Sequence, residues 1–358
     1  MSLTLTGIGK RVAGEDHIRD VSLTLAHGTV NVLLGPTLSG KTSLMRLMAG
    51  LDKPTAGTMT FDGRDITGLD VRKRSVAMVY QQFINYPTLT VFENIVSPLR
   101  VAGASKAEIE KRGQEAAALL RLTPYLDRTP LQLSGGQQQR TAIARALVKG
   151  ADLVLMDEPL ANLDYKLREE LREELPRLFA ATGSIFVYAT TEPTEALLLG
   201  GHTATLWEGR VTQFGRTAEI YRTPRDLITA KVLSDPPLNT VSVAKSGNTY
   251  RLPDGSSFET GRFQVADGAY LIGFRAHHAR LSDAPGLHLA GHVAVSEITG
   301  SESYIHVDAG ADRWVALASG VVKVDPGAPI RLSLDPQHLF LFSPSGALVA
   351  AADAAPVA

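Results

Sequence analysis

The sequence predicts an α/β domain built on a parallel sheet, followed by a separate all-β domain. Up to about residue 235, short apolar runs alternate with segments that are apolar at helical spacing, as in a parallel sheet covered by helices. Beyond Asp235-Pro-Pro-Leu238, short β-like runs follow, separated by Gly, Asp and Pro, which is typical of a sandwich or small barrel. We therefore expect domains at 1–235 and 236–346, and a disordered Ala-rich tail at 347–358.

Composition narrows the classes of function. The 358 residues suffice for two domains, and 36 basic against 37 acidic residues leave a net charge of −1. This balance argues against nucleic acid or anionic lipid as the main partner. The chain has no cysteine, which excludes disulfides and thiolate metal sites. No run is long enough to span a bilayer, and the N-terminus lacks a signal-peptide pattern, so we expect a cytoplasmic protein.

Each element of the first domain follows from a local pattern. The expected strands are Leu3–Ile8, Val21–Leu25, Val30–Leu34, Thr58–Phe61, Ser75–Tyr80, Asp152–Asp157 and Ser184–Ala189. The expected helices are Ser43–Ala49, segments within 90–122, Gln137–Val148, Tyr165–Phe179 and Pro193–Leu199. In the second domain the expected strands are Tyr270–Phe274, His292–Glu297, Ser303–Val307, Trp314–Ala318 and Ile330–Leu334.

The most informative stretch lies between the third expected strand and the first expected helix. It consists of Gly35, Pro36, Thr37, Leu38, Ser39, Gly40, Lys41, Thr42 and then Ser43. Gly35–Thr42 fits G-x-x-x-x-G-K-[ST], the P-loop pattern, in the strand–loop–helix context that the pattern requires. The glycines allow backbone N–H groups to approach phosphate oxygens, and the helix N-terminus adds partial positive charge. Lys41 would reach the β- and γ-phosphates, and Thr42 would ligate Mg²⁺.

Two further motifs fit nucleotide chemistry. Asp157-Glu158 ends a buried strand, where an acid of a P-loop protein holds Mg²⁺ and the next acid can polarise a water; a helix cap or a solvated turn is the alternative. Leu133–Gln137 opens a helix with a serine and two glycines, which makes a second anion-binding end or simply a helix capped by Ser134. Two phosphate cradles make sense if two copies of the fold enclose the nucleotide head-to-tail.

Together these motifs resemble those of the ATPase subunit of ABC transporters, over essentially the whole chain. The residues that carry the resemblance are Gly35–Thr42, Gln81, Leu133–Gln137 and Leu153–Glu158. The β region, with Gly273-Phe-Arg275 and Asp335–Phe342, looks like the tandem oligonucleotide-binding (OB) fold extension of carbohydrate importers. The resemblance implies an ABC-type ATPase domain with a helical subdomain at about 85–148 and an OB-like regulatory domain. It also implies an ATPase dimer beneath two membrane permeases, with an extracytoplasmic solute-binding protein.

The resemblance also implies roles for individual residues, with ATP and Mg²⁺ as cofactors. Lys41 and the loop amides would bind phosphates, Thr42 and Gln81 would ligate Mg²⁺, Asp157 would hold the metal through water, and Glu158 would be the general base. Ser134, Gly135, Gly136 and Gln137 would face the γ-phosphate of ATP bound on the partner. Ala161–Asp164 matches the loop that crosses the dimer interface, although Ala161 replaces a common serine. Phe83–Phe92, with Tyr86-Pro87, matches the groove for the permease's coupling helix.

The sequence departs from the family pattern at three positions. Thr191 stands where a switch histidine usually contacts the γ-phosphate, Val12 stands where an aromatic residue usually stacks on adenine, and Leu38 replaces a glycine inside the P-loop. Leu38 would place a side chain in the cradle, at a φ that must be tolerable. The substitutions are either neutral drift or signs of a weakened site on this chain's own P-loop. We favour the second interpretation, and with it a heterodimer with a consensus ATPase over a homodimer.

The sequence therefore predicts the ATP-binding subunit of an importer for a carbohydrate or polyol, with glycerol or glycerol phosphate as the leading candidates. It would be peripheral on the inner face of the cell membrane. One alternative is a non-transport ATPase of the same superfamily, although no tandem cassette or basic surface is present. The other is a regulatory module whose C-terminal domain binds a ligand or protein and whose hydrolysis is residual.

Overall fold

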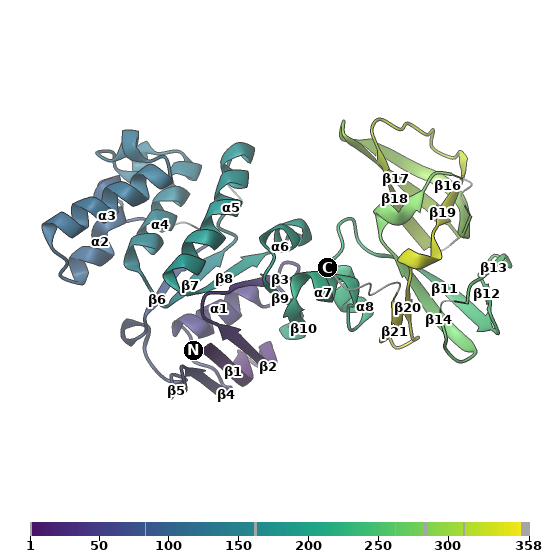
Figure 1. Cartoon of the computed structure of the whole chain (residues 1–358), viewed down its shortest axis with the longest axis horizontal. Coiled ribbons are helices and arrows are strands. Elements are labelled where there is room, and N and C mark those ends of the chain that lie inside the picture. The colour runs from purple at the N-terminus through teal and green to yellow at the C-terminus, as the bar shows by residue number, and fades with distance from the viewer. Residues whose placement is uncertain are drawn as a thin grey trace. The chain divides into compact units, whose positions relative to one another are not determined.

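The chain divides into two compact units, Met1–Thr217 and Ala218–Ala358, in a computed structural model (Figure 1) that describes residues 2–82, 84–160, 163–261, 263–282, 285–310 and 312–351. The sequence suggests a division at residue 235, but the division in the structure falls earlier, after Thr217. The reason lies in two short helices, α7 (Thr217–Arg222) and α8 (Leu227–Val232). The amide of Leu227, at the start of α8, donates to the carbonyl of Gly346 at 2.8 Å, so this helix belongs with the second unit.

A six-stranded sheet in the order β10-β9-β3-β8-β7-β6 forms the centre of the first unit. Its strands are β3 (Val30–Leu34), β6 (Val76–Val79), β7 (Leu153–Asp157), β8 (Ile185–Thr190), β9 (His202–Trp207) and β10 (Arg210–Arg216). β3, β6, β7, β8 and β9 run parallel, and β10 pairs antiparallel with β9. Every residue of β7 and β8 is buried, as expected for a parallel sheet that is covered on both faces.

Alternate residues of the central strands enter two different cores. Leu155 and Val187 pack towards α1 (Lys41–Ala49), while Met156 and Phe186 pack towards a layer of longer helices. A four-stranded antiparallel sheet, in the order β2-β1-β4-β5, shares the core of α1. Its strands are β1 (Ser2–Val12), β2 (Glu15–Ala26), β4 (Ala56–Phe61) and β5 (Arg64–Asp65). α1 is therefore held between two sheets, which fixes the position of the loop that precedes it (Figure 1).

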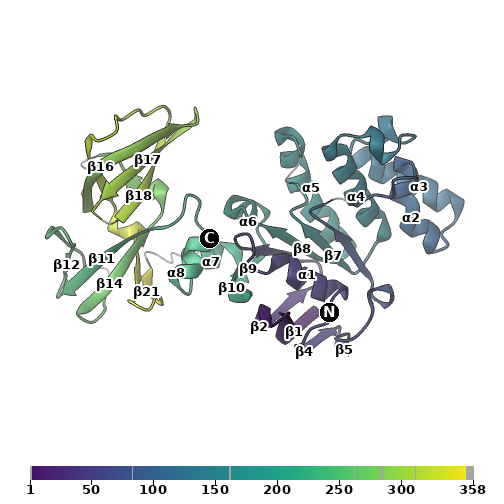
Figure 2. The same cartoon turned by 180° about the vertical axis from the view of Figure 1, so that it is seen from behind.

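The helices on the other side of the central sheet begin and end at clear local signals. They are α2 (Val91–Val101), α3 (Lys106–Leu119), α4 (Gly135–Lys149), α5 (Tyr165–Thr182) and α6 (Pro193–Leu199). Thr90 caps α2 with a capping box, and Gly103, at φ +73°, separates α2 from α3. In both views α2, α3 and α4 stand together (Figure 2), in the region where the resemblance implies a helical subdomain. Among the described residues, no helix has the length and apolar character needed to cross a membrane.

The second unit is built from two antiparallel sheets that share one hydrophobic core. The first sheet contains β11 (Asn239–Ser246), β12 (Thr249–Arg251), β13 (Ser257–Glu259), β14 (Gly268–Phe274), β20 (Phe340–Phe342) and β21 (Leu348–Ala351). The second contains β15 (Ala279–Arg280), β16 (Leu287–Ile298), β17 (Glu302–Ala309), β18 (Asp312–Ser319) and β19 (Pro329–Leu334). This all-β arrangement confirms the fold class expected for the C-terminal part.

The expected disordered tail requires a correction. Leu348–Ala351 is a strand, β21, because its backbone pairs antiparallel with β20. Residues 352–358, the rest of the expected tail, lie outside the described residues.

Candidate nucleotide site

At two positions, Gly35 and Gly40, the loop between β3 and α1 accommodates only glycine. Gly40 caps α1 at φ +104°, and a Cβ there would lie 2.9 Å from Cδ1 of Ile18. A Cβ on Gly35 would lie 2.4 Å from the carbonyl oxygen of Leu206. Both distances are closer than a real Cβ can approach a neighbour. The loop is therefore pressed against surrounding strands, and its amides begin a helix where an anion is stabilised.

Leu38 has the strained backbone that the sequence leads us to expect. Its φ is +67°, in the left-handed region that favours glycine, and the residue is 95% exposed and lines the cleft described below. The substitution strains the backbone, at about 1–3 kcal/mol for such a residue.

Lys41 is the buried cation of the site. It is 6% exposed, and its Nζ donates to the carbonyl oxygens of Gly35 at 2.8 Å and Pro36 at 3.0 Å. Burial lowers the pKa of the ammonium group, and the nearby carboxylates of Glu158 and Asp157 oppose that effect. Among the described residues, the amine's hydrogen-bond partners are thus neutral carbonyls, which a phosphate oxygen could replace.

Two hydrogen bonds bring together residues that the sequence places far apart. The Thr42 hydroxyl donates to Oδ2 of Asp157 at 2.7 Å, and Nε2 of Gln81 donates to Oε2 of Glu158 at 2.8 Å. Burial raises the pKa of the Asp157 carboxyl, although its hydrogen bond to Thr42 and the charge of Lys41 act in the opposite direction. The hydroxyl, the amide oxygen and the carboxylate form a set of oxygen donors suited to a hard divalent cation.

Glu158 is held in an unusual backbone conformation at the end of β7. Its φ is +46°, and its amide donates to the carbonyl of Ala189 at 3.0 Å. Burial is the largest cause that raises the pKa of its carboxyl, and the charge of Asp157 adds to it while that of Lys41 opposes it. A strained residue with a raised pKa is typical of functional sites. A carboxyl of this kind can accept a proton from an attacking water.

Lys41, Thr42, Gln81 and Glu158 line one cleft of about 590 Å³. Its lining includes Thr37–Ser43 of the loop and α1, together with Gln81, Glu158 and Thr191. The structure thus places Thr191 on the cleft that Glu158 faces, where the resemblance implies a switch histidine. Val12 is not among the lining residues and is 43% exposed.

Sequence reasoning missed one end of this cleft. The additional lining residues are Glu15, Asp16, His17, Arg19, Glu208 and Gly209. They come from β2 and from the turn between β9 and β10, which approach the loop only in the folded chain. Glu208-Gly209 is recognisable as a hairpin turn, but no sequence pattern relates that turn to the P-loop.

The second expected anion-binding end is a capped helix start. Ser134 Oγ accepts from the amide of Gln137 at 3.4 Å, and the Gln137 side chain accepts from the amide of Ser134 at 2.9 Å. Ser134 and Gly135 are exposed, and none of Ser134, Gly135, Gly136 or Gln137 lines the described cleft of this chain's own P-loop. This placement is compatible with both interpretations, an ordinary helix cap and a contribution to a partner's site.

The loop expected at the dimer interface lies partly within the described residues. Asp164 accepts from the amide of Leu167 at 3.0 Å and so caps the start of α5. Ala161 and Asn162 lie outside the described residues, as does Phe83 of the expected docking segment.

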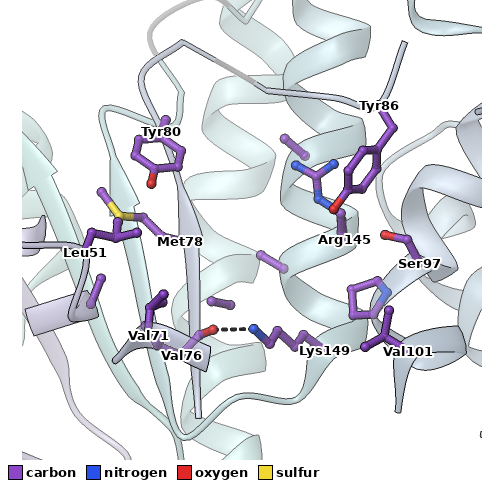
Figure 3. Close-up of a pocket in the computed structure, with 15 residues that line it drawn as sticks. Leu51, Val71, Val76, Met78, Tyr80, Tyr86, Ser97, Val101, Arg145 and Lys149 are labelled. Carbon is purple, nitrogen blue, oxygen red and sulfur yellow. Dashed lines mark hydrogen bonds between the residues drawn. The ribbon is translucent and has the colours of Figure 1, made fainter. Parts of the chain in front are cut away.

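A second cleft, of about 400 Å³, lies between β6, α2 and α4 (Figure 3). On one wall the Tyr86 ring lies against Arg145, whose guanidinium carbon is 5.3 Å from the ring centroid. Lys149 donates to the carbonyl of Val76 at 2.6 Å across the base of the cleft. Val101 is 90% exposed at its rim. The groove is therefore apolar with a fixed aromatic–cation wall, at the place where the segment 83–92 is expected to receive a partner.

The first cleft passes a chemical test for a magnesium nucleotide. Gly35 and Gly40 let the loop pack closely against Leu206 and Ile18. Lys41, Thr42 and Asp157 supply one cation and two oxygen donors. The fold and this site define a P-loop nucleotide-binding protein.

Comparison with known proteins agrees with this class and specifies it. The model of the ABC transporter family matches residues 18–161, and that of the TOBE domain matches residues 272–342. The sn-glycerol-3-phosphate import ATP-binding protein UgpC of Cupriavidus pinatubonensis is 33% identical, over 95% of this chain and 96% of its own length. The alpha-glucoside transport ATP-binding protein AglK of Rhizobium meliloti is also 33% identical, over 96% of this chain and 98% of its own. The chain belongs to the family of ABC transporter ATP-binding proteins, and it is an ABC-type ATPase.

Solved structures are similar to the ATPase part. The ATP-binding cassette MJ0796, solved as a dimer in a post-hydrolysis state bound to ADP and Pi, is 31% identical, with a TM-score of 0.56. The match covers 60% of this chain and 98% of that one. The likeness confirms the expected ABC-type fold and supports ATP as the nucleotide.

Proposed function

We propose that this chain energises an importer for a carbohydrate or a polyol by binding and hydrolysing ATP at the cleft around Lys41. The carrying observation is that Lys41, Thr42 and the Gln81–Glu158 pair line this cleft, and that Asp157 accepts a hydrogen bond from Thr42 beside it. Lys41 and the loop amides would hold the β- and γ-phosphates. Thr42, Gln81 and Asp157 would hold Mg²⁺, which neutralises charge on the phosphates when bound.

Glu158 is the proposed general base for the water that attacks the γ-phosphate. The hydrogen bond from its backbone amide to the carbonyl of Ala189 fixes the backbone, and the hydrogen bond from Gln81 orients the carboxylate. The raised pKa of this carboxyl lies closer to neutral pH, and a general base is most effective when its pKa is near the working pH. Glu158→Gln should therefore retain MgATP binding while abolishing turnover. Loss of both would assign Glu158 to binding instead.

We further propose that the chain works as one half of an asymmetric ATPase dimer. Thr191 supports this proposal because it lies on the cleft with a side chain that is too short and too weakly polar to replace an imidazole. A missing donor to the γ-phosphate typically reduces the rate by about 10²–10³. In this arrangement the segment Ser134–Gln137 would complete the site on a partner that retains the histidine. A homodimer with two Thr191 sites is the alternative.

Steady-state ATPase assays separate these arrangements. The purified chain alone should hydrolyse ATP slowly. Of the rate loss of about 10²–10³ expected from a missing donor, Thr191→His should recover at least about a factor of ten. Thr194→His, on the exposed face of α6, is the matched control because this residue does not line the cleft. Brisk turnover by the unmodified chain alone would contradict the asymmetric dimer and leave Thr191 as a tolerated substitution.

The groove beside Tyr86 and Arg145 is the proposed docking site for a permease segment (Figure 3). Its apolar side chains, such as those of Val71 and Met78, and the exposed Val101 suit the apolar face of a short helix. Docking would hold the chain at the inner face of the membrane, with a solute-binding protein on the other side. Val101→Glu should then abolish co-purification with membranes that contain the permeases while leaving MgATP affinity unchanged. Retained co-purification would remove the groove from this role.

The proposed cargo class follows from the relatives. Their names specify sn-glycerol-3-phosphate import and alpha-glucoside transport, which favour a polyol, its phosphate or a glycoside. Cells that lack this chain should lose uptake of one of these labelled solutes, and the wild-type chain, but not Lys41→Ala, should restore it. The alternative function, a regulatory or non-transport ATPase with residual hydrolysis, predicts normal uptake of all of them.

A further inference from the structure

The described cleft extends beyond the residues that would hold phosphates and metal. At one end are the P-loop, Gln81, Glu158 and Thr191. The remaining lining belongs to the segment Glu15–Arg19 of β2 and to the turn Glu208-Gly209. A nucleotide is longer than its phosphates, so this second end is where a ribose and base would lie.

Backbone hydrogen bonds join the second end rigidly to the P-loop. The amide of Gly209 donates to the carbonyl of Ser39 at 2.9 Å, and the amide of Arg19 donates to the carbonyl of Gly209 at 2.8 Å. The carbonyl oxygen of His17 would lie only 3.2 Å from a Cβ on Gly40 and 2.5 Å from a Cβ on Gly209. Residue 17 therefore has a fixed distance from the phosphate cradle.

His17 is the one residue with a ring among the described residues that line this cleft. Its side chain is exposed, so a face of the imidazole is available for stacking. Val12, where the family usually has the stacking residue, has no ring and does not line the described cleft. The chain thus lacks an aromatic side chain at the usual position and has one at another.

We propose that His17 forms the stacking surface for the base of the bound nucleotide. This inference rests on the proposed binding of the triphosphate at Lys41. Histidine rings stack on nucleobases, and one such stack contributes about 1–3 kcal/mol, or roughly 5- to 150-fold in affinity. The carboxylates of Glu15, Asp16 and Glu208 only accept hydrogen bonds. They therefore match the donors of a nucleoside, which are its ribose hydroxyls and exocyclic amine, and repel phosphates.

The test compares two probes, MgATP and magnesium tripolyphosphate, by titration calorimetry on the full chain. The second probe has the phosphates but no nucleoside. His17→Ala should weaken MgATP binding by roughly 5- to 150-fold and leave tripolyphosphate binding unchanged. His17→Phe, which keeps a ring, should retain most of the MgATP affinity. Val12→Ala, on the adjoining strand of the hairpin, and His292→Ala, an exposed histidine in the second unit, are controls that should change neither affinity.

The outcomes distinguish this inference from the proposed function. If wild-type chain fails to bind tripolyphosphate, the P-loop assignment is wrong and the inference fails with it. If tripolyphosphate binds but His17→Ala leaves MgATP affinity unchanged, or lowers both affinities equally, only the stacking role is overturned. Tighter MgATP binding by Val12→Tyr together with no effect of His17→Ala would place the base against the tip of the hairpin instead.

Discussion

Leu38 provides a direct test of how the P-loop of this chain is held. Its φ of +67° is strained for a side chain that is 95% exposed and so gains almost no burial in return. Leu38→Gly removes this strain of about 1–3 kcal/mol but adds about 0.5–1 kcal/mol of unfolded-state entropy. Leu38→Asn removes part of the strain without that entropy, because asparagine tolerates the left-handed region. The net gain should be about 1 kcal/mol for either variant.

A gain of this size is measurable in two ways. In a unit that spans Met1–Thr217, about 1 kcal/mol corresponds to roughly 2–4 °C in the melting temperature. If the strained loop opens in the free protein, the same relief tightens MgATP binding by up to about fivefold. Leu131→Gly is the matched control, since Leu131 is 86% exposed and not at positive φ, and it should only destabilise. If both Leu38 variants melt below wild type, as Leu131→Gly should, the strain argument is refuted.

Three other predictions follow from the packing and charges. Lys41→Ala should weaken MgATP binding by about 2–5 kcal/mol, the scale of losing one partner of a buried charge pair; unchanged affinity in calorimetry would make the loop vestigial. A chain ending at Thr217 should be monodisperse by light scattering. A chain ending at Asp235 should aggregate, because it retains Ala230 without Phe340 and Phe342, which pack against it. Equal behaviour of the two chains would contradict this boundary. Burial, aided by the His277 charge, lowers the pKa of His278 to about 3. As the pH falls below 6.5, the unfolded chain therefore binds a proton at His278 before the folded chain does. The free energy of unfolding should fall by up to about 1.4 kcal/mol per pH unit between pH 6.5 and about 3. In urea melts, His278→Gln should flatten the dependence of this free energy on pH, and an unchanged slope would exclude His278 as its source.

The elements that the sequence predicts best are those with local boundaries. Val30–Leu34 and Pro193–Leu199 have the bounds that the sequence pattern indicates. The helix after the P-loop ends where expected because Gly50 takes the left-handed conformation. A buried parallel strand and a glycine cap are visible in a few consecutive residues, so long-range packing has little left to decide.

Strand β9, which the sequence pattern does not predict, is buried although it contains polar side chains. In β9, Thr203 and Thr205 are fully buried, yet they look like surface residues in the sequence. Their hydroxyls pair with those of Thr217 at 2.9 Å and Thr212 at 2.7 Å. Such satisfied hydroxyl pairs make burial inexpensive, but they depend on partners that no local pattern reveals.

The site shows the same division between local and long-range information. The P-loop and the Asp157-Glu158 pair are contiguous motifs, so the sequence alone is enough to propose their chemistry. Leu38 is a local case as well, because its φ of +67° matches the strain expected from the missing glycine. The His17 end of the cleft depends on contacts between β2, the β9–β10 turn and the P-loop, so only the folded chain brings it into view.

The backbone around Thr191 is firmly held. The hydroxyl of Thr190 donates to the buried carboxylate of Glu195 at 2.6 Å and accepts from the amide of Glu192 at 3.0 Å. The hydroxyl of Tyr188 donates to the same Glu195 oxygen at 3.1 Å. Residue 191 is therefore flanked on both sides by anchored neighbours. In the proposed asymmetric dimer, Thr191→His would change one side chain on this held backbone, and the proposal therefore predicts that this single change raises the rate of hydrolysis.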